Sequence, residues 1–533
     1  MRYTNRCLPL PLPKKKRLRR ATKNIITPGL AAALDRTGIS SRRATFVLAE
    51  AAKSFGYDTE DITINRMSIH RQRKQHRAKF VEEFKARFPA DIPLIVHWDG
   101  KLLEDLTSKQ HVDRLPVIVT GEGGFSQLLG VPRIASGTGE AQASAVKCML
   151  EEWNLCDRVG GLCFDTTASN TGKKAGACIL LEQKLQHNML YFPCRHHIME
   201  LIIGTAFEKT AGAGGSSGPE IKLFKRFRDQ WEFIDKESFQ AGPVDDFVHG
   251  ALADVRSEIL EFAQHQLREK QPRDDYREFL ELSIIFIGEV PPRGVAFMAP
   301  GGMHHARWMA KVLYAMKIWL FRQQFKLTAR EEKGVRDLAL FAVRVYLKAW
   351  ITAPSAISAP LNDLQLMNQL LQCSSIHEAI SSATSKKLSS HLWYLSQELV
   401  GLALFDDRVF STTKRLMVAA LQKEETDRSP KRPEIPLNSF HSCTLDNLVT
   451  STSMNLFRLL NLPTEFLWEE QKSCAVEKRR FATLKVVNDR AERGVSLIQE
   501  YNKTLTNDEG ICSFSCKSLP IIVSDIRSLV RPN

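Results

Sequence analysis

Two aspartates, Asp99 and Asp165, each follow an apolar stretch of the chain. Asp99 lies in Ile-Val-His-Trp-Asp-Gly-Lys, and Asp165 lies in Leu-Cys-Phe-Asp-Thr-Thr-Ala-Ser-Asn. Short apolar runs of this kind are typical of buried β-strands. Two carboxylates carried on neighbouring strands would form a hard-oxygen site of the type that Mg²⁺ or Mn²⁺ prefers. The residue types therefore indicate a two-metal site for phosphoryl transfer.

The elements around these aspartates predict one mixed sheet. Five strands are expected, at residues 92–99, 114–121, 126–132, 159–165 and 189–193. One helix is expected before the fourth strand and one after it. The two helices are expected over about residues 140–153 and from about residue 170 to 185. This order resembles that of the ribonuclease H-like fold. The resemblance implies that the first and fourth strands are neighbours, so that Asp99 and Asp165 converge.

A more specific resemblance begins directly after the fifth strand. The segment Cys194-Arg-His-His197-Ile-Met-Glu-Leu, with Asp165, Ser169-Asn170 and Arg307-Trp308, resembles the hAT superfamily of DNA transposases. The likeness spans roughly residues 92–410 and includes the Cys-x-x-His motif of that family, matched by Cys194 and His197. It implies that Arg307 and Trp308 contact DNA, with the tryptophan stacked on a flipped base. From packing alone, Trp308 is equally well explained as a core residue.

The same resemblance implies a large all-helical insertion between the fifth strand and the end of the sheet domain. Residues 206–385 open near Ala-Gly-Ala-Gly-Gly-Ser-Ser-Gly and then show helical periodicity. The periodic segments lie around residues 220–236, 248–268, 276–286, 305–325 and 329–351. The fold class is therefore α/β, more closely α+β: a ribonuclease H-like five-stranded sheet in residues 91–205, interrupted by helices and flanked by helical terminal regions.

The resemblance also implies a third carboxylate after the insertion, which we expect on a helix that closes the sheet domain, within residues 386–426. Glu398 borders a stripe formed by Leu392, Leu395, Leu399 and Leu402, about 40° beyond its edge at about 100° per residue. A helix packed on the sheet would offer this glutamate to the metals. Two alternatives remain open: Glu398 is a solvated helix residue, or Glu378 takes the role.

Positive charge is concentrated at the N-terminal end. Residues 1–90 contain 21 Lys and Arg against 7 Asp and Glu, an excess equal to the net charge of +14 of the whole chain. Such asymmetry indicates a segment that faces nucleic acid. Residues 1–22 are expected to be a disordered tail that carries Lys14, Lys15, Lys16, Arg17, Arg19 and Arg20. This run is typical of a signal for a nuclear import receptor or of a phosphate contact, which predicts a nuclear protein that binds DNA, and a solvated tail is the alternative.

Residues 23–90 are expected to form a basic helical region. A helix, a Gly-containing turn and a second helix with Ser40 or Ser41 as its N-cap are typical of a helix-turn-helix. Arg42 and Arg43 near the start of the second helix would then contact DNA. A plain αα-hairpin fits the same pattern. Phe80, Phe84 and Phe88 at the end of a third, basic helix are better explained as a packing face than as a platform for bases.

The remaining patterns limit other functions. The sequence contains no run of about 18 apolar residues, so no membrane-spanning helix is expected. Its eleven scattered cysteines indicate buried thiols in a reducing compartment. Cys194 and His197 are only two of the ligands that zinc needs, so a role at the start of a helix is favoured. Many hAT proteins carry an N-terminal BED zinc finger and a C-terminal dimerisation signature. Neither pattern is evident in this sequence.

The C-terminal region, residues 427–533, is expected to contain a linker and then helices. The helices are predicted over residues 453–461, 464–481 and 483–504. The last of them is amphipathic and either packs on the core or pairs two subunits of a homo-oligomer.

Three functions remain. The leading one is a transposase-like DNA nuclease and strand transferase, or a domesticated descendant of one. The second is a non-catalytic, transposon-derived protein that binds DNA or chromatin. The third is a ribonuclease acting on RNA–DNA hybrids, against which the large helical insertion argues.

Overall fold

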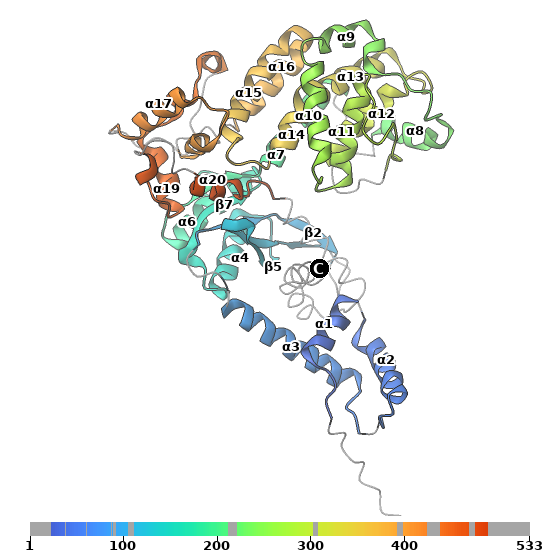
Figure 1. The fold of residues 1–533 in the computed structure, drawn as a ribbon, viewed down its shortest axis with the longest axis vertical. Helices are drawn as coiled ribbons and strands as arrows, with labels where there is room; N and C mark the ends of the chain where they lie inside the picture. The colour runs from blue at the N-terminus through green and yellow to red at the C-terminus, as the bar shows by residue number, and fades with distance from the viewer. Residues whose placement is uncertain are drawn as a thin grey trace, which may run out of the picture. The chain divides into compact units, whose positions relative to one another are not determined.

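The computed structural model describes residues 23–37, 39–59, 61–86, 88, 92–104, 111–211, 221–301, 307–391, 398–423, 437–467 and 475–488. The chain divides into two compact units (Figure 1). One contains the helices of residues 23–88, and the other contains the main sheet and the helices that follow it in the chain.

The N-terminal unit consists of α1 (Pro28–Arg36), α2 (Ser41–Ser54) and α3 (Arg66–Ala86). Each of the first two helices begins at a hydroxyl cap, because Thr27 Oγ1 accepts the Leu30 N–H and Ser40 Oγ accepts the Arg43 N–H. Helix α3 packs against both α1 and α2 around a small apolar core. The three predicted helices are therefore present.

The main sheet is mixed and has five strands in the order β5-β4-β1-β7-β8. The strands are β1 (Leu94–Trp98), β4 (Val117–Thr120), β5 (Ser126–Gly130), β7 (Val159–Phe164) and β8 (Leu190–Pro193). Strands β5, β4 and β1 pair antiparallel, whereas β1, β7 and β8 pair parallel. The prediction of an α+β protein with a five-stranded mixed sheet is confirmed.

Short elements join and cover these strands. The helices are α4 (Gly139–Glu152), α5 (Ala168–Thr171) and α6 (Ala177–Leu185), with 3₁₀ turns η1 (Glu122–Gly124) and η2 (Cys156–Arg158). Strands β2 (Lys101–Glu104), β3 (His111–Arg114) and β6 (Arg133–Ile134) form a smaller sheet. Helix α4 begins at Thr138, whose hydroxyl accepts the Ala141 N–H, and packs along α6.

The helical region begins with α7 (Arg195–Ala211), which starts directly after β8. Its further elements are α8 (Lys222–Gln230), η4 (Trp231–Phe233), η5 (Gly242–Val244), α9 (Asp246–Leu252), α10 (Arg256–Arg268), α11 (Asp274–Phe286), α12 (Arg307–Leu320), α13 (Ala329–Phe341), the π-helix η6 (Ala342–Tyr346), α14 (Leu347–Thr352), α15 (Ala359–Gln372) and α16 (Ser374–Ser389). Each of the five segments with predicted helical periodicity contains at least one of these helices.

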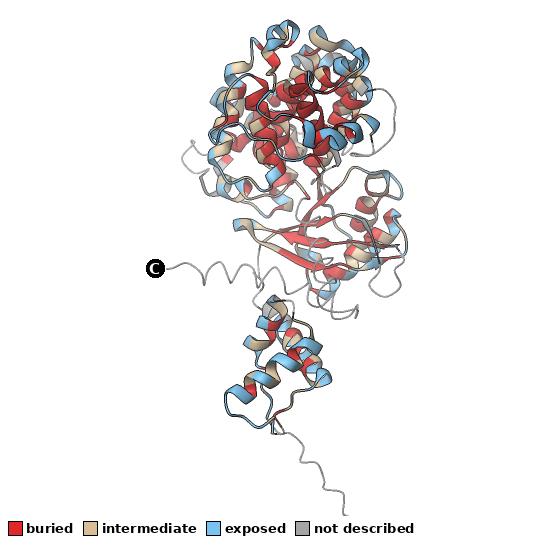
Figure 2. Ribbon diagram, turned by 90° about the vertical axis from the view of Figure 1, so that its right-hand side faces the viewer, coloured by how far each residue is buried: buried red, intermediate tan, exposed pale blue. Residues whose placement is uncertain are grey.

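One apolar core continues from the sheet into the helices. It joins strand residues such as Ile95 and Phe192 to buried side chains of α7, α11, α12 and α13. Figure 2 shows buried residues along the strands and through the centre of the helical region. Within the described residues, no helix is both long enough and apolar enough to cross a membrane.

The closing part of the chain differs from the predicted helices. Helix α16 ends at Ser389, and the next described element is a 3₁₀ helix, η8 (Leu399–Phe405), instead of one helix through residues 387–405. Residues Leu392 and Leu395 of the predicted leucine stripe lie outside the described residues. The angular argument for Glu398 therefore does not apply, because a 3₁₀ helix turns every 3.0 residues.

The C-terminal segment packs on the main sheet. Its elements are α17 (Ser411–Leu421), η9 (Leu437–Ser442), α18 (Leu445–Leu448), η10 (Ser451–Met454), α19 (Asn455–Leu459), η11 (Glu465–Leu467) and α20 (Ala475–Ala482). A Cβ atom on Gly160 of β7 would lie 2.1 Å from the carbonyl oxygen of Leu459, so only glycine permits this close approach. Residues 484–488 are not helical, so the helix predicted over 483–504 is absent from its described part.

Candidate active site at the carboxyl edge of the sheet

The two aspartates follow adjacent parallel strands at the same edge of the sheet. In the register of β1 and β7, Val96 lies opposite Leu162 and His97 lies opposite Cys163. One more step places Trp98 beside Phe164, whose rings stack with centroids 5.7 Å apart. Asp99 and Asp165 come next on the two strands, which in a sheet run about 4.8 Å apart. The first and fourth predicted strands, β1 and β7, are thus neighbours as expected. Both aspartates are half-buried.

The carboxylate of Asp165 is oriented by the loop that follows it. Its Oδ1 accepts hydrogen bonds from the Thr167 N–H at 3.0 Å, the Thr167 hydroxyl at 2.6 Å and Asn170 Nδ2 at 2.7 Å. Its Oδ2 accepts none from the described residues. One oxygen is therefore held in place by three donors, and the other is left available to a ligand.

Asn170 links this carboxylate to the end of β1. The side chain is 3% exposed, and its Oδ1 accepts the indole N–H of Trp98 at 2.9 Å. Because an indole nitrogen only donates, this bond fixes the amide orientation and directs Nδ2 toward Asp165. One buried amide thus connects the residue before Asp99 with Asp165 itself.

The C-terminal segment reaches the same edge through Asn488. His97 is buried, and its Nδ1 donates to Asn488 Oδ1 at 3.1 Å while its Nε2 lies 2.7 Å from the Thr120 hydroxyl. Asn488 Nδ2 donates to the carbonyl of Trp98 at 3.0 Å, and its backbone N–H donates to Cys194 Sγ at 3.2 Å. Sequence reasoning missed Asn488, because nothing in its local pattern signals these distant partners.

The predicted Cys-x-x-His motif is a junction between the sheet, the helical region and the C-terminal segment. The motif begins directly after β8, and the backbone N–H of Cys194 donates to the Phe164 carbonyl at 2.6 Å, which places Cys194 beside the end of β7, the strand that precedes Asp165. The next residue, Arg195, forms a fully buried ion pair with Asp363 of α15. The pKa of the Asp363 carboxyl is raised overall, because the effect of burial is larger than the opposing effect of the Arg195 guanidinium.

The two histidines of the motif have different surroundings. His196 is buried and stacks on Trp350 with ring centroids 4.1 Å apart, and its ring lies perpendicular to that of Tyr276 with centroids 5.8 Å apart. His197 is half-exposed, with Nδ1 3.8 Å from Glu200 Oε2 on the next turn of α7. Cys194 immediately precedes α7, which agrees with the favoured role at the start of a helix. His196 thus fastens α7 to the helical core, whereas His197 stays near solvent.

The third carboxylate has no structural assignment. Glu398 precedes η8 and is half-buried, and Glu378 lies on the exposed side of α16. In the described part of the chain, no three His, Cys, Asp or Glu side chains form a group that could hold a metal ion. Glu398 therefore remains a prediction.

The predicted DNA contacts are only partly within the described residues. Arg42 and Arg43 lie in the first turn of α2, and both side chains are exposed. Arg307 and Trp308 begin α12, but their side chains lie outside the described part. The basic run from Lys14 to Arg20 lies outside it as well.

Comparison with protein-family models and with curated proteins gave no match for this chain. The geometry of the sheet edge and the charge of the N-terminal region are therefore the observations that bear on function.

Proposed function

We propose that this chain is a transposase-like DNA nuclease and strand transferase of the hAT type, or a domesticated descendant that keeps its fold. The observation that carries the proposal is the placement of Asp99 and Asp165 at the ends of adjacent parallel strands. The strand order β5-β4-β1-β7-β8, antiparallel up to β1 and parallel after it, supports a ribonuclease H-like fold. The helical region that begins after β8 supports the hAT type in particular.

The residues at this edge fit a divalent metal ion. Mg²⁺ and Mn²⁺ prefer carboxylate oxygens, and Asp165 presents Oδ2 with Oδ1 already bonded to three donors. Asp99 would supply the second carboxylate. Two bound metals would activate a water or a DNA 3′-hydroxyl and stabilise the leaving oxygen of an in-line displacement.

The residues of the chain itself would hold the reacting groups in place. Thr167 and Asn170 keep the Asp165 carboxylate in one orientation, and Asn170 fixes it relative to the end of β1 through Trp98. Such outer contacts tune metal sites strongly, because they restrict the motion of the ligand. The buried His97 and Asn488 attach the C-terminal segment to the same strand.

The third carboxylate would come from an element that reaches this edge after the helical region. Glu398 is the acid that the sequence favours. Since Asn488 binds at the end of β1, the two acids that follow it in the sequence, Asp489 and Glu492, belong in the same test. The N-terminal basic region would hold DNA, and its basic run would direct the protein to the nucleus.

Nicking of supercoiled plasmid DNA by the full chain tests the proposal. We expect nicking with Mn²⁺ or Mg²⁺ that stops when the metal is chelated. Glu398→Gln, Glu378→Gln, Asp489→Asn and Glu492→Gln then identify the third acid as the one whose neutralisation abolishes nicking. A full chain that binds DNA but does not nick it with either metal would support the non-catalytic alternative instead.

A further inference from the structure

Helix α2 exposes two arginines where a helix disfavours positive charge. Arg42 and Arg43 lie in its first turn, which contains no acidic residue. The aligned peptide dipoles make a helix N-terminus partly positive, so cations there are unfavourable unless an anion faces them. Neither guanidinium group has a hydrogen bond or ion pair within the described residues, and both side chains are exposed. Their guanidinium groups therefore remain available to an external anion.

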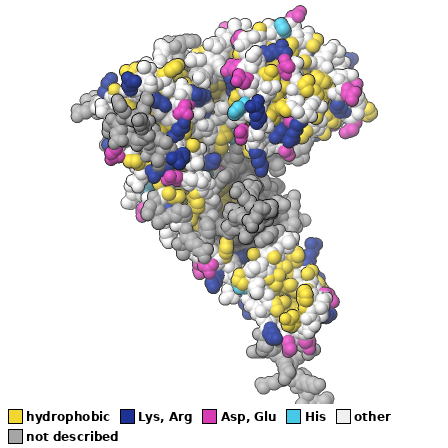
Figure 3. Space-filling view, in the orientation of Figure 1, with side chains coloured by type: hydrophobic (Ala, Val, Ile, Leu, Met, Phe, Trp, Pro, Cys, Tyr) yellow, Lys and Arg dark blue, Asp and Glu magenta, His cyan; other side chains and the backbone are white. Residues whose placement is uncertain are grey.

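The next turn of the same helix exposes apolar side chains beside them. Phe46 is 68% exposed and Val47 is 53% exposed. Each lies four residues after one of the arginines, so two arginine–apolar pairs share one face. The opposite face buries Ala44 and Ala52. Figure 3 shows hydrophobic side chains gathered on this part of the surface, with both basic and acidic side chains at its edge.

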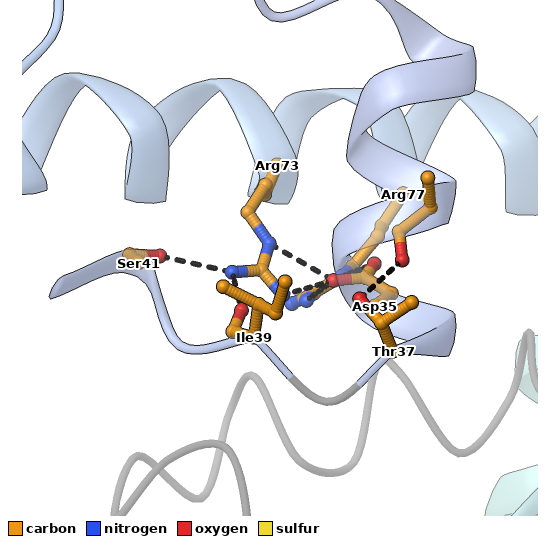
Figure 4. A network of polar contacts seen from close by, with 7 residues as sticks. Asp35, Thr37, Ile39, Ser41, Arg73 and Arg77 are labelled. Carbon is orange, nitrogen blue, oxygen red and sulfur yellow. Dashed lines mark hydrogen bonds and ion pairs between the residues drawn. The ribbon is translucent and has the colours of Figure 1, made fainter. Parts of the chain in front are cut away.

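A buried ion cluster holds the start of α2 rigidly on α3. Asp35 at the end of α1 accepts from Arg73 and from Arg77 of α3, with Arg77 Nε 2.7 Å from Asp35 Oδ2 (Figure 4). Arg73 Nη1 also donates to the carbonyl of Ile39 at 2.9 Å and to the hydroxyl of Ser41 at 3.3 Å. These bonds hold Ile39 and Ser41, directly before Arg42, against α3 and so orient the exposed face of α2 relative to α3.

The charge of the region selects the partner. Residues 23–88 contain 13 Lys and Arg against 7 Asp and Glu, which attracts a polyanion. In the major groove, arginine binds the O6 and N7 atoms of guanine, and an apolar side chain contacts the methyl group of thymine. The first residues of a recognition helix are the ones that reach base edges. An arginine pair followed by an apolar pair meets both requirements.

We propose that α2 is a recognition helix that reads base pairs in the major groove of duplex DNA. Arg42 and Arg43 bind guanine edges, and Phe46 and Val47 contact thymine methyl groups. This inference adds sequence specificity to the proposed DNA function and depends on DNA as the partner, but not on cleavage.

Sequence-specific binding by the full chain tests this role separately from catalysis. The Asp165→Asn chain is used in EDTA, so that neither cleavage nor metal affects the result. Binding sites are selected from random duplexes, and the affinity for the selected site is compared with that for a scrambled duplex. We expect a selected site that contains guanine and thymine positions and is bound more tightly than the scrambled duplex.

Matched variants then assign the contacts. Arg42→Ala and Arg43→Ala each lower the affinity for the selected site by about 10- to 100-fold, the discrimination of one bidentate arginine–guanine pair. Phe46→Ser and Val47→Ser lower the preference at thymine positions and leave binding to the scrambled duplex unchanged. Arg268→Ala and Phe410→Ser, an exposed arginine and an exposed phenylalanine outside this unit, serve as controls and keep wild-type binding.

Three results would overturn the proposal. The first is selection of no sequence above the scrambled duplex. The second is wild-type specificity in all four α2 variants. The third is a change of oligomeric state in Phe46→Ser with unchanged DNA binding, which would make this face a contact between copies of the chain. Because all four side chains are exposed, circular dichroism verifies that the variants keep the fold.

Discussion

The indole of Trp98 donates a hydrogen bond of 2.9 Å to the side-chain oxygen of Asn170. The amide nitrogen of the same asparagine donates to Asp165 Oδ1 at 2.7 Å. Trp98 directly precedes Asp99, so a single buried amide connects the two strand ends that carry the aspartates. The relative position of the two carboxylates therefore depends on a side chain that is not itself a predicted metal ligand.

Asn170→Ala should weaken the proposed nuclease. The variant removes one of three donors to Asp165 Oδ1, and losses of this type typically cost about 10- to 100-fold in activity or metal affinity. The Mn²⁺ concentration for half-maximal nicking measures the effect. Gln142→Ala, which removes a buried amide on α4, is the matched control and should leave that concentration unchanged. An equal shift in both variants would reduce the role of Asn170 to general stability.

Loss of one partner of the Arg195–Asp363 ion pair should destabilise the protein strongly. Asp363→Ala leaves the guanidinium of Arg195 buried without its carboxylate, at a cost of about 3–5 kcal/mol. The double variant Arg195→Leu with Asp363→Leu should recover most of that loss, since no charge then remains buried. Urea unfolding measures both. A loss below about 1 kcal/mol in Asp363→Ala would contradict the buried geometry.

Asn488→Ala should detach the C-terminal segment from the sheet edge. The variant removes the contacts to His97 and to the Trp98 carbonyl. Cys194, which is 6% exposed and accepts the Asn488 N–H, should then react faster with a maleimide. Cys163 lies inside β7 with 0% exposure and serves as the control, because it reacts only when the whole sheet domain unfolds. Unchanged labelling of Cys194 would show that the segment is held by other contacts.

The ion pair between Arg344 and Asp254 should contribute to acid sensitivity. Hydrogen bonds from the Arg344 guanidinium, at 2.5 and 2.6 Å, lower the pKa of the Asp254 carboxyl below its usual value of 3.8. A lowered pKa of an acid stabilises the fold above that usual value, and the contribution is lost as the pH falls through the folded-state pKa. The carboxylate is 63% exposed, so the effect is below about 1 kcal/mol.

Thermal unfolding between pH 7 and pH 3 tests this pair. The melting temperature of Asp254→Asn should be slightly lower than that of wild type at pH 7, and the difference should shrink at the acid end. Asp157→Asn removes an exposed carboxylate without such a partner and should follow the wild-type curve. A constant difference between Asp254→Asn and wild type at every pH would exclude the ion pair as its cause.

The sequence predicted the five strands of the main sheet well, because each is a short apolar run with clear boundaries. Val159–Phe164, for example, is bounded by the η2 turn and by Asp165. The C-terminal segment could not be placed in the same way. Its key contact joins Asn488 to His97, 391 residues earlier, and no local periodicity encodes so distant a pair.

Charge patterns also left the role of individual residues undetermined. The sequence shows α3 as a helix rich in Lys and Arg, but Arg73 and Arg77 point inward to Asp35 and are buried, whereas Arg71 and Lys74 are exposed. Only the packing of α1 against α3 separates structural arginines from those available to DNA. Likewise, Arg195 in the Cys-x-x-His motif resembles a surface charge until Asp363 is seen to pair with it.

The most direct test of the account is the nicking rate of matched aspartate variants with Mn²⁺. Asp99→Asn and Asp165→Asn should each reduce nicking by more than about 100-fold, because each would remove a charged metal ligand. Asp157→Asn, at the opposite end of β7, should retain the wild-type rate within about twofold. Equal nicking by wild type and by both Asp99→Asn and Asp165→Asn would contradict the proposed site.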